Sequence, residues 1–194
     1  MAGLFQPGYL PAMTIARKTF IGSTTYAGIA IPAYNATAQV FGLWNPYGSD
    51  VDLILVKLNL GVATTGTTAV SAIGLSVLYN TGNQVATGSP ITAFTQTNSL
   101  PGLLGDGNGA AGNSRGRFTL AATTTAPAFA YNLSLSSTAG TATTTAAPPQ
   151  VTWMEHDFDG AIGVAPGTYI GLGGSAAPGS TFQGSLVWME IPRT

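Results

Sequence analysis

The chain has 194 residues, contains no cysteine and carries very little charge. Without cysteine, no disulfide can hold the fold and no thiolate can serve as nucleophile or metal ligand. Charged residues make up 7% of the sequence, where about 25% is usual. Six lysines and arginines do not make the cationic surface that binds phosphates, so we expect no nucleic-acid partner. No run of about 18 apolar residues occurs, so we expect no membrane-spanning helix.

The scarcity of charge also bears on association. A surface with few charges has little electrostatic protection against binding to other molecules. We therefore expect a subunit that buries much of its surface in an assembly. The alternative is a monomer whose sheet surface is covered by threonine and serine hydroxyls.

The most informative stretch is a turn followed by a long alternating strand. Asn45-Pro46 predicts the turn, because proline presets φ and holds the preceding residue extended, and Gly48 supplies backbone freedom. In the strand that follows, the alternation predicts one face that belongs to the core along its whole length. That face comprises Ile54, Val56, Leu58, Leu60 and Val62. The opposite face begins apolar, at Val51, Leu53 and Leu55, and becomes polar at Lys57 and Asn59.

Further strands are predicted wherever apolar residues alternate between turn residues. The chain has 26 glycines and 12 prolines, and turn signals recur about every ten residues, as in all-β sandwiches. We predict an antiparallel β-sandwich of jelly-roll type without helices, with an immunoglobulin-like sandwich as the alternative. The predicted strands cover residues 14–20, 26–31, 36–43, 70–79, 117–122, 128–135, 151–158, 168–172 and 182–191. Residues 98–116 and 136–149 are predicted as irregular loops, and Asp159-Gly160 as a hairpin turn.

The start of the chain differs from the rest. Residues 1–13 contain two prolines among apolar side chains, which predicts an extended N-terminal arm anchored by Phe5, Tyr9 and Leu10. Residues 14–194 are predicted to form a single domain. The arm is expected to dock on its own domain or on a neighbouring subunit, and these three side chains are candidate partner-binding residues.

The segment 155–159 holds four ionisable groups, including the only histidine. In a strand, Glu155, Asp157 and Asp159 would share one side and could bind a hard cation such as Ca²⁺. The simpler interpretation is a solvated strand end before a turn, so no metal and no cofactor are expected. Glu155 and Glu190 end the similar triplets Trp-Met-Glu and could form an acid–base pair if their strands were neighbours.

Other motifs carry less information. A Ser–His–Asp triad would need His156, but no nucleophile elbow accompanies it. The Gly-x-Gly-x-x-Gly match at 107–112 has no amphipathic helix after it and is interpreted as a chance match. Arg115 and Arg117 are two cations at strand spacing that could pair with carboxylates of a neighbour. The three tryptophans, Trp44, Trp153 and Trp188, stand among aliphatic residues and are predicted to pack in the core.

Three stretches together resemble virion proteins of tailed bacteriophages. They are Gly42-Leu43-Trp44-Asn45-Pro46-Tyr47-Gly48-Ser49, Asp157-Phe158-Asp159-Gly160 followed by Pro166-Gly167, and Ser185-Leu186-Val187-Trp188-Met189-Glu190-Ile191-Pro192. This pattern, over about residues 25–192, resembles small jelly-roll subunits on phage capsids, namely decoration, cement or head-fibre-base proteins.

The resemblance implies a homotrimer without catalytic activity that binds the major capsid protein on the outer surface of the virion. Such a subunit would stabilise the coat lattice. Two alternatives stay open. One is a carbohydrate- or receptor-binding module of a phage tail or head fibre. The other is a glycoside-acting enzyme that uses Glu155 and Glu190.

Overall fold

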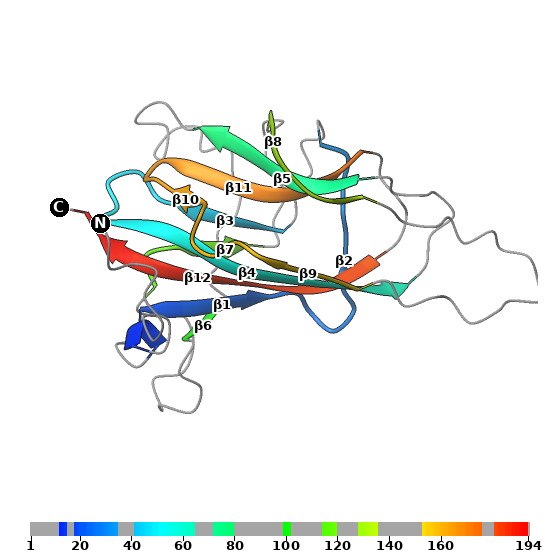
Figure 1. Ribbon diagram of the computed structural model, residues 1–194, viewed down its shortest axis with the longest axis horizontal. Coiled ribbons are helices and arrows are strands. Elements are labelled where there is room, and N and C mark those ends of the chain that lie inside the picture. Colours follow the sequence, from blue (N-terminus) through cyan, green and yellow to red (C-terminus); the bar gives the residue numbers. More distant parts are fainter. Residues whose placement is uncertain are drawn as a thin grey trace, which may run out of the picture.

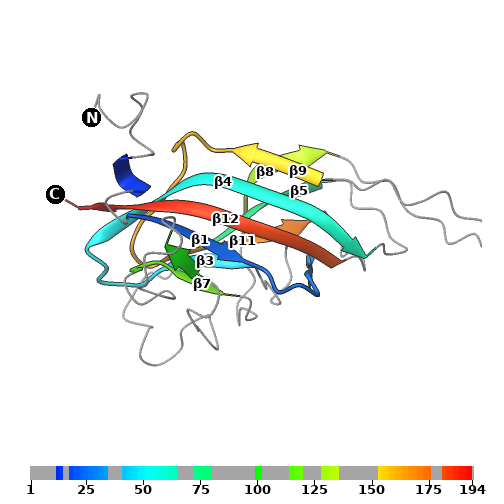
Figure 2. The ribbon, with the colours of Figure 1, turned by 90° about the horizontal axis from the view of Figure 1, so that it is seen from below.

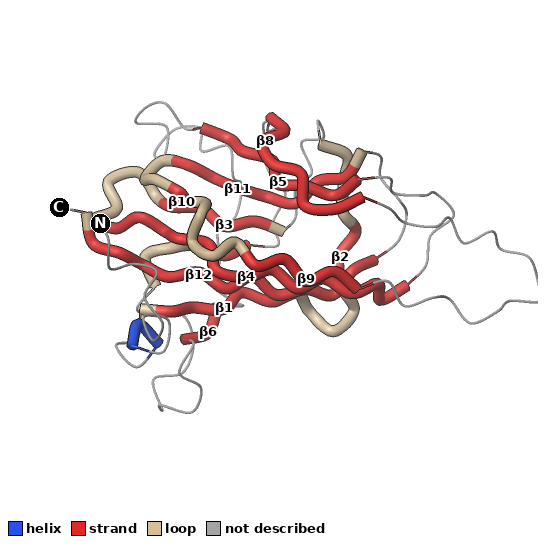
Figure 3. The backbone as a smooth tube through the Cα atoms, in the orientation of Figure 1, coloured by secondary structure: helices blue, strands red, loops and turns tan. Residues whose placement is uncertain are grey.

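The computed structural model describes residues 12–14, 18–34, 41–64, 72–79, 99–101, 114–119, 128–135, 153–175 and 181–193. Within these ranges the chain forms twelve strands arranged in two antiparallel sheets that face each other (Figure 1). The predicted all-β architecture is therefore confirmed. Figure 3 shows one short helical segment, at residues 12–14, beside the otherwise all-strand body.

The first sheet contains seven strands and the second contains five. The first sheet runs in the order β10, β4, β12, β1 and β6; β9 pairs with β4 beside β10, and β2 pairs with β12 beside β1. Its strands are β1 (Thr19–Ser23), β2 (Ile29–Ala30), β4 (Val51–Thr64), β6 (Ser99–Pro101), β9 (Trp153–Asp157), β10 (Gly163–Val164) and β12 (Thr181–Pro192). The second sheet runs in the order β7, β3, β11, β5 and β8. Its strands are β3 (Gly42–Asn45), β5 (Ala72–Tyr79), β7 (Arg117–Thr119), β8 (Ala128–Leu135) and β11 (Thr168–Gly174).

Most neighbouring strands are far apart in the sequence. β1 pairs with β12, β3 with β11, and β4 with both β9 and β10. β5 pairs with β8. The earliest strand thus lies beside the latest, and the pairs become closer in sequence toward the middle of the chain. Every one of these pairs is antiparallel.

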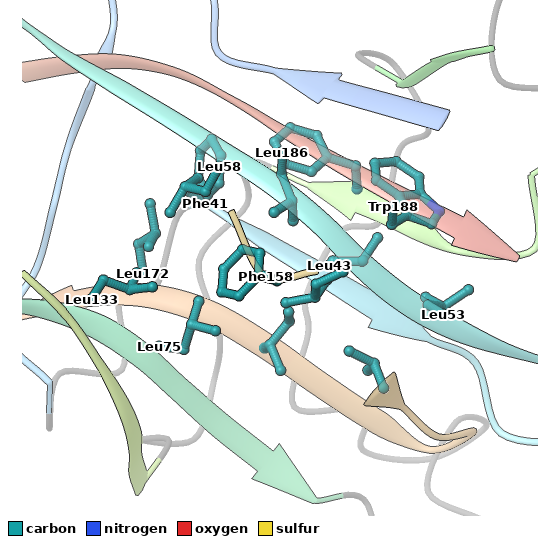
Figure 4. Packing of buried hydrophobic residues seen from close by; sticks show 14 of the residues in the cluster. Phe41, Leu43, Leu53, Leu58, Leu75, Leu133, Phe158, Leu172, Leu186 and Trp188 are labelled. Carbon is teal, nitrogen blue, oxygen red and sulfur yellow. The ribbon is translucent and has the colours of Figure 1, made fainter. Parts of the chain in front are cut away.

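The core fills the space between the two sheets (Figure 4). Its centre is aromatic: the Phe118 ring meets Phe41 edge-on at 5.0 Å and stacks on Trp188 at 6.4 Å. β1 can pass beside this cluster only because residue 22 is glycine, since a Cβ there would lie 2.2 Å from Phe118 Cγ. In the strand predicted at 70–79, alternation places Ile73, Leu75 and Val77 on one apolar face, and in β5 these side chains do contribute to the core. Sequence alternation therefore identified the core face of this strand correctly.

The turn before β4 has the predicted form. The Ser49 amide donates to the Pro46 carbonyl over 3.1 Å, and Gly48 has φ of +81°. The buried amide Nδ2 of Asn45 donates to Val51 O at 2.9 Å and to Val164 O at 2.8 Å. Asn45 therefore fixes the end of β3 to the start of β4 and to the end of β10 in the opposite sheet.

The prediction of one continuous core face along β4 is wrong. Between its pairs with Trp188 and Val187 of β12, β4 carries one extra residue, Val56, which makes a β-bulge. The bulge reverses the alternation, because a slip of one residue turns every later side chain to the other face. The core residues of β4 are consequently Val51, Leu53 and Leu55 before the bulge, and Leu58 and Leu60 after it.

The Asp159-Gly160 turn is present but does not make a hairpin. Asp159 and Gly160 have φ of +48° and +74°, and the Ala161 amide donates to Phe158 O at 2.7 Å. The strands on either side, β9 and β10, both pair with β4 on the same edge. The turn is therefore an interruption within one edge strand, and the predicted hairpin is wrong.

Several predicted boundaries also shift. Residues 12–14 are helical, so the strand predicted at 14–20 begins only at Thr19. The strand predicted at 26–31 shortens to β2, because residues 26–27 form a turn. Ser99–Pro101 pairs with β1, so the predicted irregular loop at 98–116 contains a short strand. The loop predicted at 136–149 lies outside the described residues, as do residues 1–11 of the predicted arm.

Candidate functional site

Half of the described charged side chains lie at the end of the sandwich where β1 begins and β12 ends. We call this region, comprising Lys18, Asp50, Asp52, Arg115 and Arg193, the charged end. Arg115 Nε lies 3.3 Å from Asp50 Oδ1, and Arg193 Nε lies 3.5 Å from Asp52 Oδ1. All four side chains of these ion pairs are exposed to solvent. Backbone hydrogen bonds connect the segments that carry these residues: Arg193 N donates to Asp50 O, and Glu190 N donates to Lys18 O.

Beneath the charged end lies a buried carboxylate. Glu190 is only 3% exposed, and its Oε1 accepts three hydrogen bonds. The donors are Ser114 Oγ at 2.7 Å, Arg115 N at 2.7 Å and Gly116 N at 2.8 Å. Charge-assisted bonds of this kind are stronger than neutral ones. Glu190 therefore fixes the segment before β7 against the last strand of the opposite sheet.

The predicted partner-binding residues are distributed unevenly. Arg115 lies exposed at the charged end, where its partner is Asp50 of the same chain. Arg117 lies in β7 opposite Trp44 of β3, and its side chain is not described. Phe5, Tyr9 and Leu10 lie outside the described residues.

The acidic segment does not gather a metal site. Glu155 and Asp157 are exposed, whereas His156 on the other side of β9 is partly buried, as alternation predicted. Glu155 forms an ion pair with Lys57 of the neighbouring strand, which is the main reason that the pKa of Lys57 is raised. Asp159 lies in the turn beyond the strand. Among the described residues, no three histidine, aspartate or glutamate side chains lie close enough together to hold a metal ion.

Glu155 and Glu190 are not brought together. β9 and β12 lie on opposite sides of β4, where Glu155 pairs with Asn59 and Glu190 pairs with Leu53. Leu53 and Asn59 are six residues apart in β4, and at about 3.3 Å per residue this spacing separates Glu190 from Glu155 by about 20 Å along the strand direction. The carboxyl pairs of glycosidases lie about 5–10 Å apart. This geometry does not fit the acid–base pair considered from the sequence.

His156 takes part in an aromatic cluster instead. Its ring lies 4.7 Å from that of Phe158 and 5.8 Å from that of Tyr131, both in edge-on or T-shaped contact. Tyr131 belongs to β8, at the edge of the second sheet, whereas His156 belongs to β9 of the first. The cluster therefore closes one open side of the sandwich, which is a structural role.

The two tryptophans with described side chains are buried, as predicted. Trp188 is at the centre of the core. Trp44 packs with Tyr169 and Leu78 in a second cluster on the far face of the second sheet. The Tyr169 ring lies across Gly42, where a Cβ would approach its hydroxyl to 2.2 Å. Burial raises the pKa of Tyr169 well above its usual range.

A depression of about 510 Å³ lies on the outer face of the first sheet. We call it the polar groove. It crosses the three central strands β4, β12 and β1, which lie side by side in Figure 2, and it reaches the loop that joins β1 to β2. Its lining is Ser23, Thr24, Thr25, Tyr26, Asn59, Leu60, Gly61, Gln183, Gly184 and Ser185.

Sequence reasoning did not identify the polar groove. Its side chains come from three segments that are distant in the sequence, and each segment alone resembles an ordinary solvated strand face. The one local signal was the change from apolar to polar residues, at Lys57 and Asn59, along one face of the predicted strand. Only the pairing of Asn59 with Ser185, and of Ser185 with Ser23, brings the hydroxyl and amide groups into one row.

Comparison of the chain with protein-family models, curated proteins and solved structures finds no match. Among the residues that the structure describes, no helix is long and apolar enough to cross a membrane.

Proposed function

We propose that the sandwich is a jelly roll. Eight strand positions result when β1 and β2, and likewise β9 and β10, are each counted as one interrupted strand. Their pairs are then first with last, second with seventh, third with sixth, and fourth with fifth. This is the pattern of one long antiparallel hairpin rolled into two sheets, the eight-strand arrangement of jelly rolls.

The immunoglobulin-like alternative fits this pairing less well. In that fold the first two strands are neighbours in one sheet. Here β1 and β3 lie in different sheets, and so do β3 and β4. β6 and β7, which lie between the fourth and fifth positions in the sequence, add one outer strand to each sheet.

The functional proposal is a structural subunit of a tailed-phage virion that binds the outer capsid surface and stabilises the coat lattice without catalysis. Jelly rolls are common in viral capsid proteins. The pairing pattern is the observation that carries this proposal. The very low charge, the turn-rich sequence and the resemblance to phage decoration proteins support it. We propose a homotrimer for the assembled form and the major capsid protein as its partner.

The charged end is the best candidate for the capsid contact. Exposed ion pairs contribute little to stability, because solvent screens them. Arg115 and Asp50 can therefore exchange partners with charged groups of a neighbour at small cost. The segment 12–14 is tied to the start of β1 at the same end, through bonds from Lys18 N to Met13 O and from Thr14 Oγ1 to Thr19 Oγ1. A docking arm that precedes this segment would begin beside these charges.

Co-sedimentation with capsids assembled from the coat protein of the same virus tests this proposal. We expect the full chain to bind as a trimer by light scattering, and deletion of residues 1–13 to abolish binding while circular dichroism still shows a folded sheet protein. Arg115→Glu should weaken binding. Lys57→Glu, with the same change of charge on the outer sheet face, should not. Full binding by both the deletion variant and Arg115→Glu would refute the assigned contact.

A further inference from the structure

We propose that the polar groove binds a neutral saccharide chain. The proposal goes beyond the structural role above and does not depend on it, because a virion subunit can bind both a capsid and a glycan. It rests on the chemistry of the lining, on an exposed aromatic ring held on a fixed loop, and on an open glycine position in the wall of the groove.

The lining offers hydroxyl and amide groups without charge. Ser23, Thr25 and Ser185 supply hydroxyls, while Asn59 and Gln183 supply carboxamides, which both donate and accept. The lining contains no aspartate, glutamate, histidine, lysine or arginine. The nearest charged group across the sheet, Glu155 opposite Asn59, is already paired with Lys57. A charged ligand would therefore lose water without gaining a counter-charge, whereas sugar hydroxyls find both donors and acceptors.

Tyr26 stands at the edge of the groove with 95% of its surface exposed. The flat face of an aromatic ring is electron-rich and attracts the C–H groups on one face of a sugar ring. Tyr26 can therefore supply the stacking platform that the other lining residues lack.

The loop that carries Tyr26 is held in place. Gly28 N donates to Thr25 O at 3.0 Å and closes a turn, in which Gly28 has φ of +74°. Thr24 N donates to Gly184 O at 2.9 Å, and Gly184 N donates to Thr24 Oγ1 at 3.1 Å. The Gln183 side chain also donates to Tyr26 O. These bonds fix the backbone that carries the ring before a ligand arrives, which reduces the entropy lost on binding.

Gly61 leaves space where a side chain would otherwise stand. A Cβ at this position would meet no atom within 4 Å. The neighbours of Gly61 across the strands are Gln183 and Trp153. An open groove that crosses three strands suits several linked sugar units better than one enclosed small molecule.

The test begins with the full chain on an array of neutral, sialylated and sulfated glycans, followed by calorimetric titration of the strongest binder. We expect binding to neutral glycans. Tyr26→Ala should weaken the affinity about tenfold, the size of one lost aromatic contact. Gly61→Gln should abolish binding by filling the groove. Tyr47→Ala removes a second exposed tyrosine, 56% exposed and outside the lining of the groove, and should leave the affinity unchanged.

NMR chemical-shift changes of the backbone amides, recorded on the unmutated protein, provide a measurement that does not depend on how well a variant folds. On titration with the same glycan, shifts should concentrate at Asn59, Gly61, Gln183 and the loop around Tyr26. The proposal is overturned if no neutral glycan binds, if only acidic glycans bind, or if the shifts lie outside the groove. Wild-type affinity in folded Tyr26→Ala and Gly61→Gln would also overturn it.

Discussion

Replacing Glu190 by alanine should destabilise the fold more than any other loss of a single described charge. Its carboxylate is buried and accepts hydrogen bonds from Ser114 Oγ, Arg115 N and Gly116 N, at 2.7–2.8 Å. Removal leaves the Arg115 and Gly116 amides without their acceptor in a region packed against Leu53 and Trp188, whereas Ser114 Oγ can still donate to Gly116 O at 2.9 Å. A buried donor left unsatisfied costs about 1–3 kcal/mol.

The magnitude follows from these bonds. At about 1.5 kcal/mol for each charge-assisted bond, three bonds give about 4.5 kcal/mol. Water can reach the Arg115 amide, which is only partly buried, and Ser114 Oγ can donate to Gly116 O instead, so we expect Glu190→Ala to lower the free energy of unfolding by about 3 kcal/mol. Glu190→Gln retains an acceptor of the same shape but not the charge, and should lose about half as much.

Urea unfolding, followed by the intrinsic tryptophan fluorescence, measures this difference. The midpoint should fall at an unchanged slope if the variant alters stability without changing the surface exposed on unfolding. Glu155→Ala is the matched control, because it removes a carboxylate from the same sheet at an exposed, solvent-screened position. The reasoning is refuted if Glu190→Ala shifts the midpoint no further than Glu155→Ala does.

Two other predictions concern glycine and tyrosine packing. Gly22→Ala should lower the free energy of unfolding by about 3 kcal/mol, because the new Cβ would overlap the buried Phe118 ring. Gly61→Ala should raise the free energy of unfolding by about 0.5–1 kcal/mol, because the new Cβ would meet no atom within 4 Å. Equal melting temperatures for the two variants would contradict this. Tyr169→Phe should stabilise by about 1 kcal/mol at neutral pH, because the Tyr169 hydroxyl is buried without a partner among the described residues. Burial raises the pKa of Tyr169, so above about pH 10 the tyrosine loses its proton in the unfolded chain but keeps it in the folded protein. The unmutated protein therefore becomes less stable relative to the Tyr169→Phe variant, by about 1.4 kcal/mol per pH unit in the free energy of unfolding. Urea unfolding midpoints at neutral and alkaline pH measure this change in stability. A difference in midpoint between the variant and the unmutated protein that stays the same at both pH values would contradict the prediction.

The local chemistry of the chain predicted much of the fold. Alternation identified the long strands β4, β5, β8 and β12, because a period of two is a property of each strand itself. Asn45-Pro46 and Gly48 predicted their turn, because φ restrictions act on single residues.

Register is different, because it depends on the partner strand. The sequence of β4 alternates without a break, yet the extra residue Val56 exchanges its two faces. Nothing within the strand marks that position. The bulge becomes visible only in the register of β4 against β12, and it lies where the Asp159-Gly160 turn interrupts the other neighbour of β4.

The candidate sites depend even more on tertiary structure. From the sequence alone, Glu190 was a possible acid–base partner of Glu155, and only the order of the strands shows that the two are far apart. The polar groove could not be predicted, since Ser23, Asn59 and Ser185 become neighbours only when the first, third and last strand positions pair in one sheet. The sequence by itself determined the long strands, the turn before β4 and the low charge of the surface, because these follow from neighbouring residues. The tertiary structure decided which face is buried and which polar groups meet, because those depend on contacts between segments far apart in the chain.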